Sequence, residues 1–303
     1  MIYDIVILTD CRYENPDETD WYIEQILLED GLVQRALEKK GLKVIRKSWD
    51  AKDFDWTQSR YAIFRSTWDY FDRFDEFFNW FEKTRKILEF INCPEIIYWN
   101  LDKHYLKDLK QSNINIPPTI FIEKGEQQSL NELFKKTEWT KAVLKPAIAG
   151  AARETFLIKK EEHLYYEKEL QRLIKKESML FQEFQHQIQR KGEMSLMMIK
   201  GQFTHAVLKK AKPGDFRVQD DFGGTVLDYV PNKEEIAFAE KAIAACPKET
   251  IYGRVDVFYD NDNLLSLGEL ELIEPELWFR KHHTGADKLA DAIFMQIQHN
   301  ITS

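Results

Sequence analysis

The sequence predicts an α/β layer at the N-terminus, followed by an α+β region built on antiparallel sheets. Residues 1–100 alternate strand-like apolar runs with amphipathic segments, a pattern typical of a Rossmann-like layer. Later strand-like runs follow one another across short turns, which is typical of antiparallel hairpins. A chain of 303 residues is long enough for two or three subdomains, each with its own core.

The amino-acid composition limits which kinds of molecule the protein is expected to bind. The net charge is -8 and the pI is near 5.5, which argues against nucleic acid and anionic membrane. Cys11, Cys93 and Cys246 form no CxxC pair and are odd in number, so neither a disulfide framework nor a zinc site is expected. The chain opens on a strand-like run, and no apolar run reaches the roughly 18 residues of a membrane helix. We expect a soluble cytoplasmic protein that acts on small molecules.

The N-terminal elements follow from apolar periodicity. We expect a strand over "DIVILTD", a helix over "DWYIEQILLEDGLVQRALEKKG" that ends at Gly41, and strands over "KVIRKSW" and "YAIFRSTWDY". No GxGxxG motif is present, so dinucleotide binding is not indicated. Aromatic residues recur at helical spacing and predict core packing: Trp68, Phe71, Phe74, Phe77, Phe78 and Phe81.

The rest of the chain predicts hairpins framed by helices. A helix capped by Asn100 or Asp102 should run to about Ser112, before two prolines lead into a strand. "KAVLKPAIAGAARETFLI" predicts a strand, a small-residue loop and another strand. A charged helix, a strand over "SMLFQEFQ", a hairpin turning at Lys200-Gly201 and a loop over 213–224 should follow. Further helices are expected over 233–246 and from about Gly285.

The stretch "GELELIEPEL" places two carboxylates on one side of a predicted strand. Side chains alternate along a strand, so Glu269 and Glu271 project together. The strand-like run "YGRVDVFY" comes before it and ends at the turn-forming residues 260–263. A loop with an even number of residues there pairs Asp256 with position 267 or 269, on the face that carries the two glutamates and Arg254. Such carboxylates suit a hard cation such as Mg²⁺ with a nucleotide's phosphates. The alternative is a solvated outer face of the sheet.

Taken in order, residues from about 95 to 290 resemble the ATP-grasp superfamily. "FRSTWDY" and "GELELIEPEL" look like the O-ureido-D-serine cyclo-ligase group, and the order of motifs is also similar to glutathione synthetase. The resemblance implies a Rossmann-like (pre-ATP-grasp) substrate domain over 1–100 and a two-subdomain ATP-grasp fold with antiparallel sheets. Its small subdomain is expected over 101–180 and its C-terminal subdomain over 181–303.

The resemblance also implies nucleotide-binding roles. Lys103 and Lys145 match the two lysines that reach the phosphates, although each also fits an ordinary surface or snorkelling lysine. Gly150 lies in the small-residue loop that lets backbone N–H groups approach an anion. In "FQEFQ", the backbone of Glu183 and Phe184 matches the adenine-binding hinge. Glu193 matches the ribose-binding position, with a surface glutamate as the alternative.

Further matches concern catalysis and metal binding. Asp256, Glu269 and Glu271 fall on the family's magnesium positions, with Mn²⁺ as the alternative cation. Arg254 matches the arginine that faces the tetrahedral intermediate in D-alanine:D-alanine ligase. Arg217 resembles the arginine of a mobile loop that closes on phosphate or substrate. Lys209, Lys210 and Lys212 could share that role or merely keep a hairpin soluble.

Substrate recognition is expected at the strand ends of the N-terminal layer. Open α/β sheets bind ligands at the carboxyl ends of their strands, where Arg12, Arg65 and Asp69 are predicted to lie. The two arginines could grip a carboxylate bidentately. Helix capping is the alternative for Ser66, Thr67 and Asp69.

Together these features predict an ATP-dependent carboxylate–amine ligase, which would include amide-forming and cyclising enzymes. It would act on an amino acid or small peptide through an acylphosphate, with Mg²⁺. A small-molecule kinase on the same scaffold and a nucleotide-binding module without turnover stay open as alternatives. A homodimer is compatible with the sequence, which does not specify the acid, the amine or whether the reaction is a cyclisation.

Overall fold

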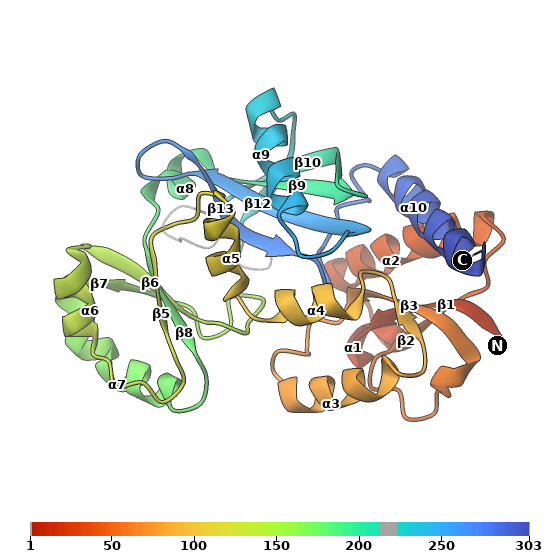
Figure 1. Cartoon of the computed structure of the whole chain (residues 1–303), viewed down its shortest axis with the longest axis horizontal. Helices are drawn as coiled ribbons and strands as arrows, with labels where there is room; N and C mark the ends of the chain where they lie inside the picture. The colour runs from red at the N-terminus through yellow and green to blue at the C-terminus, as the bar shows by residue number, and fades with distance from the viewer. Residues whose placement is uncertain (1, 213–222, 303) are drawn as a thin grey trace.

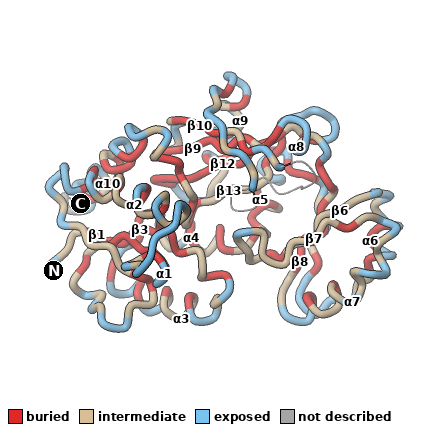
Figure 2. Tube along the Cα trace, turned by 180° about the vertical axis from the view of Figure 1, so that it is seen from behind, coloured by how far each residue is buried: buried red, intermediate tan, exposed pale blue. Residues whose placement is uncertain are grey.

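The protein is described by a computed structural model that covers residues 2–212 and 223–302. The described chain forms three sheets, which Figure 1 shows as an N-terminal layer, a large sheet and a small sheet. Buried residues follow the strands of the first two sheets, whereas the loops and outer helix faces are exposed (Figure 2). Within the described residues, none of the helices combines the length and apolar character needed to cross a membrane.

The N-terminal layer is the Rossmann-like sheet that the sequence predicts. Its strands are all parallel, in the order β2-β1-β3-β4. Ile5 to Leu8 are fully buried, as expected of a parallel strand covered on both faces. Its elements are β1 (Tyr3–Thr9), α1 (Cys11–Glu14), α2 (Trp21–Lys39), β2 (Val44–Ser48), a 3₁₀ turn (Trp56–Gln58), β3 (Ser59–Ser66), α3 (Phe74–Thr84) and β4 (Glu89–Phe90).

The large sheet is antiparallel, in the order β11-β10-β9-β12-β13. The hairpin predicted around Lys200-Gly201 joins β9 to β10, and both turn residues have positive φ. The second predicted hairpin joins β12 to β13. The elements of this part are α8 (His186–Lys191), β9 (Glu193–Ile199), β10 (Gln202–Lys210), β11 (Thr225–Tyr229), α9 (Lys233–Ala244), β12 (Tyr252–Tyr259), β13 (Leu265–Glu271) and α10 (Thr284–Thr302).

The small sheet is also antiparallel, in the order β5-β8-β6-β7, and α6 and α7 pack on it. The strand, small-residue loop and strand predicted from residue 141 are confirmed as β6, its following loop and β7. Its elements are β5 (Thr119–Ile122), α6 (Leu130–Thr137), β6 (Lys141–Pro146), β7 (Phe156–Lys159), a 3₁₀ turn (Lys160–Glu162), α7 (His163–Ile174) and β8 (Met179–Glu183).

The connection between the N-terminal layer and the other two sheets differs from the prediction. In place of one helix from Asn100 or Asp102 to about Ser112, the structure has α4 (Pro94–Leu101) and α5 (Tyr105–Gln111). The chain is extended at Asp102, so Lys103 lies between the helices and not in a first helical turn. The Lys103 N–H donates to the Ala147 carbonyl at 2.9 Å, which fixes the break beside the small-residue loop.

Packing crosses the expected domain boundaries at 100 and 180, which stay predictions. Helix α5 packs on the large sheet: Leu106 and Leu109 share a core with Met194 and Leu196 of β9. Helix α10 packs against α2 of the N-terminal layer, as Figure 1 shows. The first and last segments of the chain therefore share one core.

The aromatic stripe forms the predicted core around α3. Phe77 and Phe81 are fully buried against the parallel sheet. Trp68 and Phe71 also pack on this core but reach a large cavity, so packing alone does not account for them.

Asn92 ties the N-terminal layer to the β12–β13 hairpin. Its buried amide donates to the carbonyls of Tyr252 at 2.8 Å and Leu272 at 2.7 Å. Its side-chain oxygen accepts the Ile251 N–H at 2.6 Å. Its φ of 60° lies in the left-handed region, which asparagine and glycine tolerate best.

We expect Asn92→Gly to lower the free energy of unfolding by about 3 kcal/mol, because three buried backbone groups lose their partner. Glycine keeps the left-handed backbone free of strain. Chemical denaturation of the purified protein measures the change.

The matched control is Asn113→Gly, because Asn113 is exposed and has a φ of 58°. It should change stability by no more than about 0.5 kcal/mol. Equal effects of the two substitutions would show that the Asn92 hydrogen bonds contribute little.

Candidate active site

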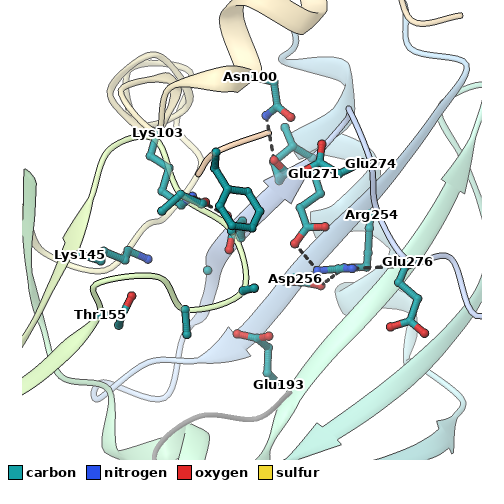
Figure 3. A pocket seen from close by; sticks show the side chains of 18 of the residues that line it. Asn100, Lys103, Lys145, Thr155, Glu193, Arg254, Asp256, Glu271, Glu274 and Glu276 are labelled. Atoms are coloured by element: carbon teal, nitrogen blue, oxygen red, sulfur yellow. Dashed lines mark hydrogen bonds and ion pairs between the residues drawn. The ribbon is translucent and has the colours of Figure 1, made fainter. Parts of the chain in front are cut away.

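A cavity of about 300 Å³ lies where the three sheets meet. The small sheet lines it with Val143 and Lys145, and the large sheet with strands β9, β10, β12 and β13. The N-terminal layer contributes aromatic side chains: Tyr22, Trp68, Tyr70 and Phe71. Figure 3 shows the charged residues that project into it.

The β12–β13 register brings the predicted carboxylates together. Asp256 is directly opposite Glu269, one of the two positions predicted, and Arg254 is opposite Glu271. The loop itself is not even-numbered as expected, because residues 260–264 separate the paired Tyr259 and Leu265, and a register shift between Asp256 and Val257 produces the alignment. Arg254 donates from Nε and Nη2 to the two oxygens of Asp256, each at 2.9 Å, and also pairs with Glu271. All four side chains line the cavity, so the solvated-face alternative is wrong.

Asp256 is the most enclosed of these carboxylates. Besides Arg254, it accepts from Lys209 Nζ at 3.0 Å and Ser195 Oγ at 2.6 Å. Burial alone would raise its pKa, but the cations and hydrogen bonds hold the pKa well below its usual range. Asp256 is therefore a fixed negative charge.

The side chains predicted to bind a metal ion are all carboxylates. Within the described parts of the chain, no three His, Cys, Asp or Glu side chains are grouped closely enough to hold an ion. The predicted carboxylates Asp256, Glu269 and Glu271 each pair with a cation. Burial raises the pKa of Glu271 despite Arg254, and Glu269 and Asp256 add to the increase. Carboxylate oxygens are the ligands that Mg²⁺ prefers, but each of these three now pairs with Arg254, Lys103 or Lys209. The residues fit Mg²⁺ once their present partners are exchanged.

The two lysines predicted to bind the nucleotide line the same cavity, but only one of them is ion-paired. Lys103 is buried, donates to the Ala149 carbonyl and pairs with Glu269 at 2.9 Å. Lys145, on β6, has no ion-pair partner among the described residues. Burial lowers the pKa of Lys145, Lys103 lowers it further, and Glu269 opposes them. Lys145 is therefore a cation that an incoming anion would stabilise.

Lys209 is a site residue that the sequence left undecided. It is buried on β10, between Glu193 at 2.6 Å and Asp256 at 3.0 Å. The signal was present in the alternation of "HAVLKK", which puts Lys209 on the side of buried His205 and Val207. The same ion pair shows that Glu193 is not a surface glutamate, although its ribose role stays a prediction.

The small-residue loop after β6 closes one side of the cavity. A Cβ on Gly150 would lie 2.6 Å from the Phe71 ring, so this contact admits only glycine without rearrangement. Ala151 and Ala152 have φ values of 47° and 53°, in the left-handed region. Such conformations cost about 1 kcal/mol or more each, which the surrounding structure must offset.

The backbone expected to bind adenine is already hydrogen-bonded. The Phe184 N–H donates to the Lys141 carbonyl at 3.2 Å, and the Phe184 carbonyl accepts from the Asn261 amide at 3.0 Å. The Glu183 carbonyl accepts from Gln185 at 3.2 Å. Glu183 lines the cavity, and Phe184 is buried behind it. An adenine contact would have to displace or share these bonds.

The predicted substrate residues are placed differently from the expectation. Arg12 is exposed and pairs with Asp10 at 2.6 Å, while Asp69 accepts from Trp49 and Arg73. Arg65 is buried and donates to the Pro275 carbonyl at 3.1 Å. None of Arg12, Arg65 and Asp69 lines the large cavity, since each is held by the protein. Arg217 lies outside the described residues.

Three sheets around one cavity of lysines and carboxylates define an ATP-grasp protein. The chain belongs to the RimK-like ATP-grasp family, whose model matches residues 102–275. Residues 5–92 match the N-terminal domain of the D-cycloserine synthetase DcsG. The resemblance to ATP-grasp proteins and to the cyclo-ligase group is thereby confirmed.

Individual relatives agree with this assignment. The cycloserine biosynthesis protein DcsG of Streptomyces lavendulae is 26% identical over 263 residues, which cover 81% of this chain and 86% of that protein. The crystal structure of D-cycloserine synthetase DcsG has a TM-score of 0.85 at 23% identity and covers 96% and 99% of the two chains. D-alanine–D-alanine ligase from Bacillus anthracis has a TM-score of 0.65 at 15% identity, over 97% and 96%. These structures establish the fold.

Lys145→Met should weaken binding of MgADP at least tenfold, because a charged hydrogen bond to phosphate contributes about 1.5–3 kcal/mol. The free protein should be as stable as before or slightly more stable, because an enclosed cation without a partner is removed. Isothermal titration and thermal unfolding measure the two effects.

Lys135→Met, on the exposed face of α6, is the control and should change neither quantity. Loss of stability in Lys145→Met without loss of nucleotide affinity would contradict the assignment.

Proposed function

We propose that this protein is a ligase that uses ATP to join a carboxylate to an amine through an acylphosphate. The proposed substrate is an amino acid or small peptide, and the proposed cation is Mg²⁺. One observation carries the proposal: Lys103, Lys145 and Arg254 face the same cavity as the carboxylates of the β12–β13 hairpin (Figure 3). Membership of the ATP-grasp family supports the use of ATP.

The chemistry would proceed in two displacements. A substrate carboxylate oxygen attacks the γ-phosphorus, the bond to the bridging oxygen breaks, and ADP leaves. The amine then attacks the acyl carbon, the bond to the phosphate oxygen breaks, and the amine loses a proton. No side-chain nucleophile is required.

The described residues would divide this work. Lys103 and Lys145 would hold the phosphates at their end of the cavity. Arg254 would stabilise the oxyanion of the second displacement, a contribution of about 3–4 kcal/mol for one well-placed donor. Bound to Asp256, Glu269 and Glu271, Mg²⁺ would neutralise charge on the phosphates.

The substrate class and cell compartment are also part of the proposal. The match of residues 5–92 to the DcsG N-terminal domain supports a small substrate derived from an amino acid, and an intramolecular amine is the case it favours. The three cysteines are free thiols, in keeping with the proposed cytoplasmic location.

Hydroxylamine tests the acylphosphate directly. With MgATP and individual amino acids or dipeptides, the full chain should release ADP and form a hydroxamate, because hydroxylamine attacks the acyl carbon in place of the amine. ADP formation without hydroxamate would favour the kinase alternative. Nucleotide binding without ADP formation from any carboxylate would favour the non-catalytic module.

Asp256→Asn and Glu269→Gln should each lower turnover by about two orders of magnitude or more, because each removes a proposed cation ligand. The measurement is ADP release at saturating ATP, with circular dichroism as a check of folding. Glu240→Gln, exposed on α9, should retain full activity. Full activity of Glu269→Gln would refute the site assignment.

A further inference from the structure

The two sides of the large cavity differ in chemistry. Lys103 and Lys145 lie on one side, whereas Glu274 and Glu276 lie on the opposite side (Figure 3). Phosphates would occupy the basic side, which leaves the acidic side for the rest of the substrate. We propose that this acidic side binds the ammonium group of the amine substrate, and the inference rests on the ligase function proposed above.

The wall of the acidic side is aromatic and held in place. The ring centroids of Tyr22 and Trp68 are 6.3 Å apart and the ring planes are inclined by 43°. Tyr13 packs edge-on against Trp68. The Trp68 indole N–H donates to the Glu274 carbonyl at 2.9 Å. Ring faces attract cations, and rings fixed by packing need little ordering on binding.

The Glu276 carboxylate is anchored close to the proposed reaction centre. Glu276 pairs with Arg280, which also bonds Glu29 at 3.1 Å. The Glu276 carbonyl accepts from Arg254 at 3.3 Å. An ammonium group bound here would therefore lie beside the arginine proposed to face the acyl carbon.

A second observation marks this side as a ligand site. A small cavity of about 10 Å³, enough for about one water-sized atom, adjoins the large one and shares Trp68 and Glu276 with it. Arg65 is only 3% exposed and lines this small cavity. Its Nε has no hydrogen-bond partner among the described residues. A buried donor in this state needs an acceptor.

The acceptor that Arg65 Nε needs is more suitably one uncharged oxygen than a carboxylate. Asp30 and Glu29 lie 3.8 and 4.0 Å from the guanidinium and already offset its charge. The recognised substrate would thus carry an ammonium group at Glu274 and Glu276 and present an oxygen, directly or through water, to Arg65. In this proposal Arg65 contacts a single substrate oxygen and does not bind a substrate carboxylate bidentately, as the sequence had suggested.

The first test compares the ammonium group with an uncharged replacement. Phosphate release with MgATP identifies the most active compound among amino acids of both configurations. The 2-hydroxy acid of the same skeleton should then bind at least tenfold more weakly, because its neutral hydroxyl does not replace the positive charge of an ammonium group beside Glu274 and Glu276. Quenching of tryptophan fluorescence with MgADP present measures binding without turnover. Equal affinity of the two compounds, or no amino acid bound, would overturn the proposal.

The second test removes the carboxylates without changing their shape. Glu274→Gln and Glu276→Gln should each raise the KM for the amino acid at least tenfold and leave the KM for ATP within about twofold. Trp68→Phe gives an independent variant if either glutamine substitution impairs folding, and it should also raise the amino-acid KM. Glu240→Gln is the matched control.

The outcomes separate the two levels of inference. Absence of ADP and hydroxamate from the unaltered protein would count against the ligase function itself. Normal turnover with an amino-acid KM that none of the three variants raises would leave the ligase function standing and overturn the ammonium site alone.

Discussion

The site depends on burying opposite charges together on one face of the β12–β13 hairpin. Asp256 is almost inaccessible, and its charge is sustained by Arg254, Lys209 and a serine hydroxyl. Removing one member of such a group leaves the others desolvated without compensation, which typically costs several kcal/mol. The charged residues are thus structurally interdependent as well as chemically suited to phosphate.

This constraint explains why the hairpin is held from outside the large sheet. The β13 edge has no further strand beside it within the described chain, but side chains near α4 and α5 satisfy its backbone. Asn100 bonds the Leu270 carbonyl and the Leu272 N–H, and the Tyr105 hydroxyl accepts the Leu270 N–H. With the strand fixed, Glu269 and Glu271 keep their orientation toward the cavity. The break between α4 and α5 also directs Lys103 to Glu269.

Sequence alone predicted the features that depend on local periodicity. Strand alternation was sufficient to predict that Glu269 and Glu271 share a face. The even-numbered loop was a wrong prediction, because residues 260–264 separate the paired strands and a register shift after Asp256, which turn chemistry does not reveal, puts Asp256 opposite Glu269. The predictions were wrong where tertiary contacts decide. The Lys103 N–H bonds Ala147, far away in sequence, and this interrupts the expected helix. Arg12 lies in α1, beyond the end of β1, and its pairing with Asp10 depends on side-chain orientation, which periodicity does not determine. Its substrate role stays a prediction.

The pairing of charges in the free protein bears on how nucleotide and cation would enter. Lys103 and Lys209 already hold carboxylates, so phosphates that took these lysines would leave Glu269 and Asp256 short of positive charge. A cation that took only the carboxylates would leave the lysines unpaired. Entry of both together keeps every enclosed charge compensated, whereas either alone creates a desolvated ion. Lys145 is the exception among the described cations that line the cavity, because it gains a partner without any pair being broken. It is therefore the natural first contact for a phosphate.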